Sequence, residues 1–538
     1  MQIGSWTTSE AVGKYGPTPR GVLECGRCQE NLYDNLIIFD PYQNNEVLAG
    51  ILAPSWSFND DATQLTLNLL KGVQWHDGKP FTAADVVSTM QLHNGQRSVD
   101  GFVQLGTSPY WTTVLTDIRA VDDNTVVFDL SQPSASLLPR LTASSGGGSI
   151  KMWPAHIPLE ELAGNPTGTA AFKFKADRRD VFVELQRNDA SFRKDPEGRA
   201  LPYLDGVRYN QFQDETLLLA AFRTAKIEYL DVFHGPTVTP RIDQLTRAIP
   251  GLVLDDYAQT IYGANLKNEP PWNDSRVAEA MDLWTDRKEL LEVETQGFGS
   301  FYPSGVLPVE LGGQWGLPPK EIMSRPGYRY LDTNGNLIDS LQELEANRDT
   351  MVKDPADMAR AKELLAEAGI EPGTIKPEML MMNVVAQRSG PTWARQMSKL
   401  FEATWTIRSP VTATEYVIEL IFGRFEIGFH NYGGFGVDEP YSTYEVFGGL
   451  LGAPPVADGF GRPENIVALF NEQDLELDVA KRREIIYDLQ RASMDLRIRL
   501  FSLAPLGHGA NRPEVKNRPF ASAATQNVFT YDRVWLER

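Results

Sequence analysis

Residues 69–86 read LLKGVQWHDGKPFTAADV. The Asp-Gly pair within His76-Asp77-Gly78-Lys79 is typical of a tight turn. Thr82-Ala83-Ala84-Asp85 has the pattern of a capping box, in which the side chains at the first and fourth positions accept hydrogen bonds from each other's backbone. A helix is therefore predicted from there to about His93. Residues 65–69, just before, alternate apolar and polar side chains as a half-buried strand does.

Outward from this stretch, strand and turn signals dominate as far as about residue 270, and longer helices follow. Asp274 can cap a helix with an apolar face, and Asp354-Pro355 places a cap before a proline, the order expected at a helix start. Residues 463–498 are typical of two further helices, after which short strands return.

This change in composition predicts two lobes. We expect lobe I at residues 1–264, with an additional subdomain inserted within it, lobe II at 265–494, and a return to lobe I at 495–538. The 538 residues exceed a typical domain of ~150 residues more than threefold, which agrees with several compact parts. Two lobes joined by more than one crossing of the chain describe a hinged clamp.

The charge of the chain excludes some functions. The 51 basic and 71 acidic residues give a net charge of −20, which opposes binding to nucleic acid or to an anionic membrane surface. It allows a cationic ligand or simple solubility and does not choose between them. No stretch approaches the ~18 apolar residues of a membrane span. Residues 1–6 lack the features of a signal peptide, as in a cytosolic protein or in an exported protein whose signal has been removed.

The two cysteines, Cys25 and Cys28, are separated by two residues. A single CxxC lacks the second ligand pair of a tetrahedral zinc site, and its Gly- and Pro-rich surroundings are unlike the helix N-terminus of a redox motif. A short-loop disulfide in an oxidising compartment is the leading interpretation. Two free thiols, and redox or metal chemistry, are the alternatives.

Motifs for catalysis or cofactor binding are absent from the sequence. No two of the six histidines have metal-binding spacing, and there is no P-loop and no G-x-S-x-G elbow. Residues 332–343 place acidic or amide side chains at four ligand positions of a calcium loop. Leu337 stands where that loop needs glycine, so an Asn-Gly turn before a helix is the simpler interpretation. We expect no cofactor and no metal.

Several segments, in the right order, resemble one protein family. Residues 69–86 match its signature almost residue for residue. Further matches lie at 31–36, 52–56, 168–172, 201–205, 271–277 with 286–287, and 361–369. The chain is therefore identified as similar to the family 5 extracellular solute-binding proteins of ABC transporters, which include dipeptide, oligopeptide and nickel receptors.

The resemblance implies an α/β fold, a two-lobed periplasmic-binding-protein-like clamp with an enlarged N-terminal lobe. Such a clamp closes on a ligand in an interlobe cleft, catalyses no reaction and presents the ligand to an ABC permease in the membrane. The resemblance also implies a periplasmic or extracellular location, with or without a lipid anchor, and hence a signal peptide that has been removed. That setting makes the disulfide more credible. We further expect a monomer.

The family also implies where ligand residues lie. A recurring element is a strand, then an aromatic residue, then an acidic loop, and here residues 429–440 read FHNYGGFGVDEP. In the peptide receptors the first aspartate of this loop pairs with the α-amino group of the peptide, but that position is Gly436 here, with Asp438 nearby. A buried ammonium without a carboxylate costs several kcal/mol. The candidate ligand-binding residues are Tyr432, Asp438, Tyr416, Phe435, His430, Trp405, Trp393, Arg388 and His508.

The sequence thus predicts an extracytoplasmic substrate-binding receptor of an ABC importer, with a peptide or peptide-like solute as cargo. An oligosaccharide receptor of the same family is the alternative, since aromatic platforms and hydrogen-bonding groups suit a neutral ligand. A glycan hydrolase with a carboxylate pair is a minor alternative that no nucleophile motif supports. A scaffold or sensor that uses the clamp without transport is a third.

Overall fold

The fold is taken from a computed structural model of the chain. The structure describes residues 1–6, 26–43, 47–97, 109–142, 150–162, 164–178, 181–212, 214–231, 241–258, 261–306, 308–311, 313–381, 388–410, 415–416, 419, 423–432, 440, 463–497, 499–519 and 530–537. No helix among these residues is both long enough and apolar enough to cross a membrane.

The described residues form two compact units. Unit 1 contains those of Met1–Tyr257 and His508–Arg538, and unit 2 contains those between Ala258 and Gly507. The first boundary therefore falls at Tyr257 rather than at the expected 264, and the return begins at His508 rather than at 495. The reason is strand pairing, because β13 (Ile261–Leu266) pairs with the first part of β20 (Arg499–Asn511) within unit 2.

The larger sheet of unit 1 has the order β11-β1-β10-β9-β8, and the C-terminal end of β20 pairs with β11. β1 (Gln2–Trp6) lies between β10 (Gly206–Phe212) and β11 (Tyr229–Asp231) and is parallel to both. β9 (Phe182–Arg187) and β8 (Phe172–Arg178) continue the sheet in antiparallel order. Side chains from this sheet and from α1 (Gly26–Leu32) share one apolar core.

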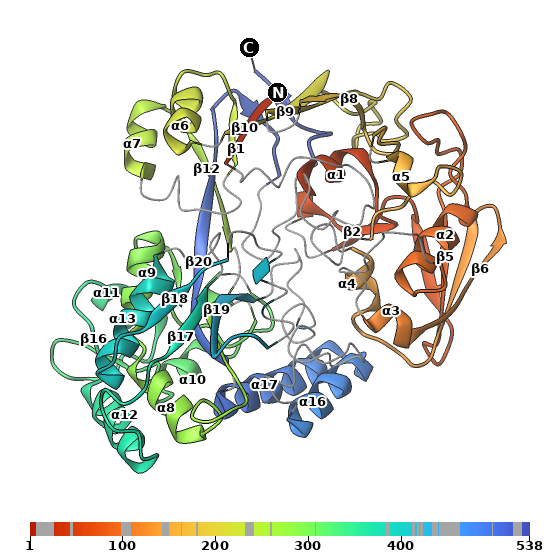
Figure 1. Ribbon diagram of the computed structural model, residues 1–538. Helices are drawn as coiled ribbons and strands as arrows, with labels where there is room; N and C mark the ends of the chain where they lie inside the picture. Colours follow the sequence, from red (N-terminus) through yellow and green to blue (C-terminus); the bar gives the residue numbers. More distant parts are fainter. Residues whose placement is uncertain are drawn as a thin grey trace. The chain divides into compact units, whose positions relative to one another are not determined.

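A separate four-stranded sheet lies within unit 1. Its order is β4-β5-β7-β6, with bounds Ser55–Phe58, Gln64–Asn68, Thr125–Leu130 and Leu115–Asp122. In Figure 1 α2 lies beside this sheet. The stretch 69–86 folds as predicted. Gly78 adopts a positive φ of 88°, and the backbone N–H of Trp75 donates to the carbonyl of Lys79. Thr82 and Asp85 form the capping box of α2 (Ala83–His93).

The remaining elements of unit 1 are short. They are β2 (Ile37–Phe39), η1 (Pro41–Gln43), β3 (Leu48–Gly50), α3 (Pro109–Val114), α4 (Leu137–Leu141), α5 (Leu159–Leu162), α6 (Glu215–Arg223), α7 (Ile242–Ala248), β12 (Val253–Ala258), β21 (Val515–Lys516) and β22 (Trp535–Leu536). β12 pairs with β20.

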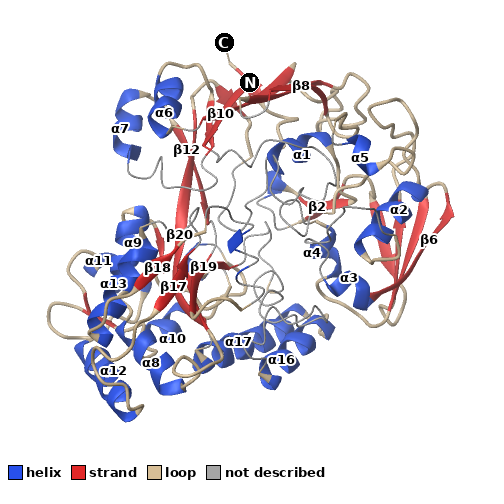
Figure 2. Cartoon of the chain, in the orientation of Figure 1, coloured by secondary structure: helices blue, strands red, loops and turns tan. Residues whose placement is uncertain are grey.

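Unit 2 is built on a sheet with helices against it. The strand order is β18-β17-β19-β13-β20, with β14 (Gly299–Ser300) on the far side of β20. The remaining bounds are β17 (Glu378–Met381), β18 (Thr406–Arg408), β19 (Ile427–Tyr432), α8 (Ser275–Trp284), α9 (Arg287–Thr295), α12 (Pro355–Glu367) and α13 (Ser389–Phe401). These four helices gather around the strands in Figure 2 and share one apolar core with them.

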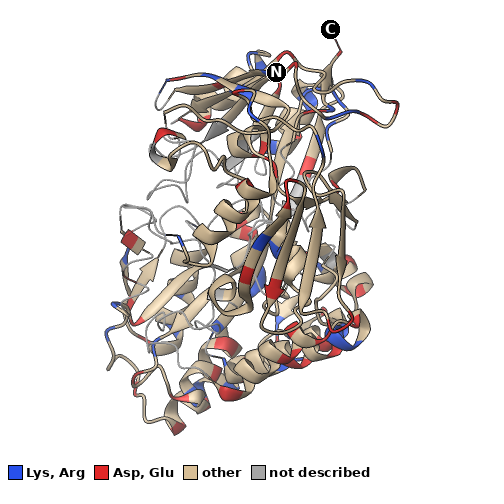
Figure 3. Ribbon diagram, turned by 90° about the vertical axis from the view of Figure 1, so that its right-hand side faces the viewer, with Lys and Arg blue, Asp and Glu red and all other residues tan. Residues whose placement is uncertain are grey.

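The predicted helix starts of unit 2 are confirmed. The Asp274 side chain accepts a hydrogen bond from the N–H of Arg276, and Asp354 caps α12 with Pro355 at its first position. Residues 463–498 contain the two expected helices, α16 (Glu464–Leu475) and α17 (Val479–Leu496). The smaller elements are η4 (Val309–Leu311), α10 (Pro319–Met323), β15 (Tyr330–Leu331), α11 (Leu341–Asn347) and β16 (Val352–Lys353). Acidic and basic residues are interspersed along the chain (Figure 3).

Candidate functional site

β19 presents different chemistry on the two faces of the sheet in unit 2. Side chains alternate between the faces of a strand, and Ile427 and Phe429 lie in the apolar core against the helices. Gly428 and His430 therefore lie on the opposite face. His430 is nonetheless buried, so this second face also contains interior polar groups.

Two neighbouring strands add polar side chains to that face. Asn265 on β13 is paired directly with Arg499 on β20, and cross-strand partners share a face. The side-chain nitrogen of Asn265 lies 3.0 Å from Nε2 of His430. All three side chains are buried. We call Asn265, His430 and Arg499 the polar row.

The polar row contains an uncharged imidazole beside a cation. Burial, and then the positive charge of Arg499, lower the pKa of His430 to about 3, so this histidine is neutral at physiological pH. Because the amide N–H of Asn265 donates to Nε2, the ring proton resides on Nδ1. The ring of Tyr416 packs on the same imidazole, with 5.6 Å between centroids. This arrangement offers fixed hydrogen-bonding groups rather than a general acid or base.

The structure brings together two predicted site residues, His430 and Tyr416, and separates two others from them. Trp393 and Trp405 belong to the apolar core, with their rings 5.5 Å apart and nearly perpendicular. The indole N–H of Trp393 donates to the hydroxyl of Thr285 at 3.0 Å. Core packing accounts for both rings, and we remove them from the candidate site.

Arg388 and His508 lie at different places. Arg388 is exposed before α13, and its guanidinium contacts the carbonyl of Glu294. His508 is buried on β20, in the part of that strand that belongs to unit 1. Tyr432 ends β19 opposite Ile261, with nothing described of its side chain.

The loop that carries the other two predicted residues, Phe435 and Asp438, lies outside the described residues. Their assignment as ligand residues stays a prediction from the resemblance.

Sequence reasoning missed Asn265 and Arg499. A signal was present, because Arg499 opens a strand whose next residues are Leu500 and Phe501, and a charged residue in such a strand is rarely buried without a partner. Its pairing with Asn265 could not be read locally, since the two lie far apart in the sequence.

The suspected calcium loop is a turn followed by a helix cap. Asp332 Oδ1 accepts hydrogen bonds of 2.8 Å from the backbone N–H groups of Asn334 and Asn336. Glu343 accepts from the N–H of Asp339 at the start of α11. The Ser340 hydroxyl accepts from the N–H of Glu343 as the N-cap of α11, so these contacts are those of an Asn-Gly turn and a capped helix start. Within the described ranges, no group of three or more His, Cys, Asp or Glu side chains could hold a metal ion.

Cys28 is disulfide-bonded, which agrees with the leading interpretation of the CxxC segment. Cys25, the other cysteine of the chain, lies outside the described residues.

Comparisons with known proteins match most of the chain. The model of the bacterial extracellular solute-binding proteins, family 5 middle, matches residues 48–445. A Brucella ovis protein, provisionally named an ABC transporter peptide-binding protein, is 30% identical over 271 residues, which cover 48% of this chain and 46% of that protein. The chain thus matches about half the length of that relative. The dipeptide-binding protein of Escherichia coli is 24% identical over 394 residues, covering 70% of this chain and 64% of that protein.

A solved structure shares the fold over the whole chain. It is the periplasmic binding protein DppA of Helicobacter pylori, in complex with the peptide STSA. The TM-score is 0.77 at 18% identity, covering 100% of this chain and 98% of that one. The α/β fold class expected from the sequence is therefore confirmed.

Proposed function

This chain belongs to family 5 of the bacterial extracellular solute-binding proteins, and on that premise we propose that it is the substrate-binding component of an ABC importer. The observation that carries the proposal is the family match over residues 48–445. The family binds solutes rather than catalysing a reaction, which argues against the glycan hydrolase. Its extracellular character supports a site of action outside the cytoplasm, next to a membrane permease.

We propose a peptide or peptide-like cargo. The names of the Brucella ovis and Escherichia coli relatives refer to peptides, and the Helicobacter pylori protein holds one. The polar row is compatible with such a ligand, because a neutral imidazole and a carboxamide match the hydrogen-bonding groups of a peptide backbone. The oligosaccharide alternative loses support, since it relied on aromatic platforms and two of its rings, Trp393 and Trp405, lie in the core.

The test is to identify what the purified protein retains. Native mass spectrometry, followed by affinity selection from a mixture of short peptides and oligosaccharides, should recover peptides. A recovered peptide at 100 times its dissociation constant should stabilise the protein by about 2.7 kcal/mol. Recovery of oligosaccharides alone, with no peptide bound, would overturn the peptide proposal.

A variant of the polar row tests whether these residues take part in solute binding. His430→Gln keeps a neutral hydrogen-bonding side chain, and we expect it to weaken binding of the recovered peptide by at least about tenfold, the scale of one hydrogen bond. His156→Gln is the matched control, because His156 pairs with Asp77 at the surface of unit 1. Equal affinities of the two variants and the wild type would exclude the polar row from the solute site.

A further inference from the structure

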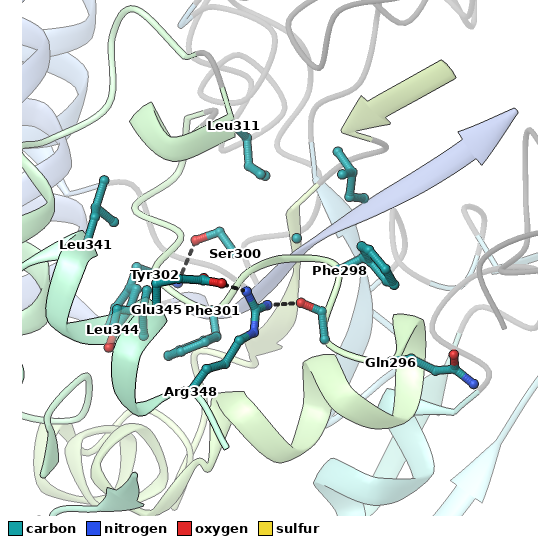
Figure 4. Close-up of a pocket in the computed structure, with 13 residues that line it drawn as sticks. Gln296, Phe298, Ser300, Phe301, Tyr302, Leu311, Leu341, Leu344, Glu345 and Arg348 are labelled. Atoms are coloured by element: carbon teal, nitrogen blue, oxygen red, sulfur yellow. Dashed lines mark hydrogen bonds and ion pairs between the residues drawn. The ribbon is translucent and has the colours of Figure 1, made fainter. Parts of the chain in front are cut away.

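Unit 2 contains a cavity of about 500 Å³ beside β14 and α11. It lies within the range of ~300–1,000 Å³ that small-molecule sites occupy. Residues 296–302, which run from the end of α9 through β14 to the two residues after it, form one wall, and α11 with the residue that follows it forms another (Figure 4). None of its lining residues belongs to the polar row.

The walls are largely apolar. Phe298 and Leu341 line the cavity, yet 40% and 39% of their surfaces stay exposed to solvent. The other apolar side chains of the lining include Phe301, Leu311, Leu344 and Leu506. A ligand with an apolar body would cover side chains that the fold itself leaves in contact with water, and that burial is favourable.

One cation lies at the edge of this apolar lining. The guanidinium of Arg348 donates one hydrogen bond to the carbonyl of Gly297. Among the described residues, the acid that pairs with it is Glu345 at 3.8 Å, beyond hydrogen-bond distance, and the Glu345 side chain is 80% exposed (Figure 4). A guanidinium has five N–H donors in a planar fork that suits the two oxygens of a carboxylate.

The loop under the cavity is fixed in place rather than adaptable. The N–H of Leu506 donates to the carbonyl of Phe298 at 3.1 Å, and Gly299 pairs with Pro505 of β20. Gly299 has a φ of 123°, and a Cβ there would meet the carbonyl oxygen of Ala504 at 2.3 Å, so only glycine allows this close approach. A preformed wall lowers the ordering cost of binding.

We propose that this cavity is a second small-molecule site, which binds a monocarboxylate with an aromatic or short aliphatic body. The apolar part of the ligand covers Phe298 and Leu341. Its carboxylate takes a bidentate position on Arg348, in place of the long contact to Glu345. The proposal concerns α11 and the loop 296–302 and does not depend on the solute carried by the polar row.

The experiment is a titration of the full chain, with labelled leucine and valine methyl groups, followed by NMR. Phenylacetate is the probe, and phenylacetamide is the neutral counterpart of the same shape. We expect saturable shifts at the methyls of Leu341, Leu344 and Leu506, with phenylacetate bound at least about tenfold more tightly than the amide, because a hydrogen bond to a charged group contributes roughly 1.4 kcal/mol or more.

Variants then test whether Arg348 is the cation that binds the carboxylate of the probe. Arg348→Met should reduce phenylacetate affinity to that of phenylacetamide, and Arg348→Lys should give an intermediate value, since lysine keeps the charge but loses the planar fork. Arg360→Met on α12 is the control, an exposed arginine paired with Glu363 and Glu367. The proposal is overturned if acid and amide bind equally, if Arg348→Met binds phenylacetate as the wild type does, or if no methyl of the cavity shifts. Peptide binding is measured separately, so the two proposals can fail independently.

Discussion

Replacing the buried Lys353 gives the sharpest test of how the interior charges of unit 2 affect stability. Its ammonium on β16 donates to the carbonyl of Gly327, and the guanidinium of Arg287 donates to the same oxygen at 2.7 Å. Two cations therefore share one acceptor in the interior of unit 2, although Asp282 and Asp357 lie nearby. Burial, and then the charge of Arg287, lower the pKa of Lys353 to about 7 from its usual 10.5.

The sign of the pH effect follows from this lowered pKa. Between pH 7 and 10.5 the unfolded chain binds a proton at Lys353 that the folded chain does not, so stability rises with pH in that window and is lost as pH falls. Integrating the difference in bound protons from pH 6 to pH 8, for a folded pKa of about 7, gives about 1.4 kcal/mol. In a unit of this size, where 1 kcal/mol shifts Tm by about 2–4 °C, that corresponds to a shift of about 3–6 °C.

The perturbation is Lys353→Met, which keeps the length of the side chain and removes the titrating group. We expect the wild type to gain about 3–6 °C more in Tm than this variant between pH 6 and pH 8, measured by calorimetry of the unit 2 transition. The difference in Tm between the two proteins removes the contribution of the histidines, because both proteins contain the same histidines. Lys320→Met is the control, because Lys320 pairs with Asp339 at the surface. Identical pH dependence of wild type and Lys353→Met would refute the reasoning.

Three other predictions concern unit 1. Asp85→Ala removes the acceptor of the Thr82 N–H in the capping box of α2 and the partner of the Trp75 indole N–H, and should cost about 2–4 kcal/mol in denaturant unfolding; a cost below about 0.5 kcal/mol would contradict the role of the capping box. Lys151→Met leaves the carboxylate of Glu30 buried without its 2.7 Å partner and should cost about 3–5 kcal/mol, most of which Glu30→Gln should restore in the double variant. Burial lowers the pKa of His93 to about 4. Between pH 6.5 and 4 the unfolded chain therefore binds a proton at His93 that the folded chain does not, so stability falls as the pH falls. Calorimetry should show that His93→Gln loses less stability than the wild type over this pH range.

Local chemistry made much of the fold predictable. The turn at Gly78, the capping box at Thr82 and Asp85, and the capped proline start at Asp354 each depend on residues within a few positions of one another. Hydrogen bonds of this kind form in the same way whatever the rest of the chain does. Their positions in the structure therefore agree with the sequence predictions to within a residue or two.

The errors have a physical cause in packing between distant segments. Trp393 has the helical spacing and the aromatic character that suit either a core or a ligand platform, and only its contacts with Trp405 and Thr285 decide for the core. The boundary between the two compact units differs from the expected lobe boundary for a related reason. β13 and the start of β20 are separated by more than 200 residues of sequence, and their pairing assigns both to unit 2.

β19 shows how far alternation alone can lead towards a site. Period two in the sequence is enough to place Phe429 and His430 on opposite faces of one strand. The alternation does not predict that His430 contacts Asn265. This contact depends on the register of β13 and β19, in which Gly263 lies opposite His430, and no residue near either strand determines that register alone. A usable signal nevertheless exists. Some strands have apolar side chains at their core-facing positions and buried Asn, His or Arg side chains at the alternate positions. We expect such strands to pair in the register that brings these polar side chains together. The reason is that a buried polar side chain without a partner costs more free energy than a mispaired apolar one. On that argument the polar row is a consequence of the pairing of β13, β19 and β20.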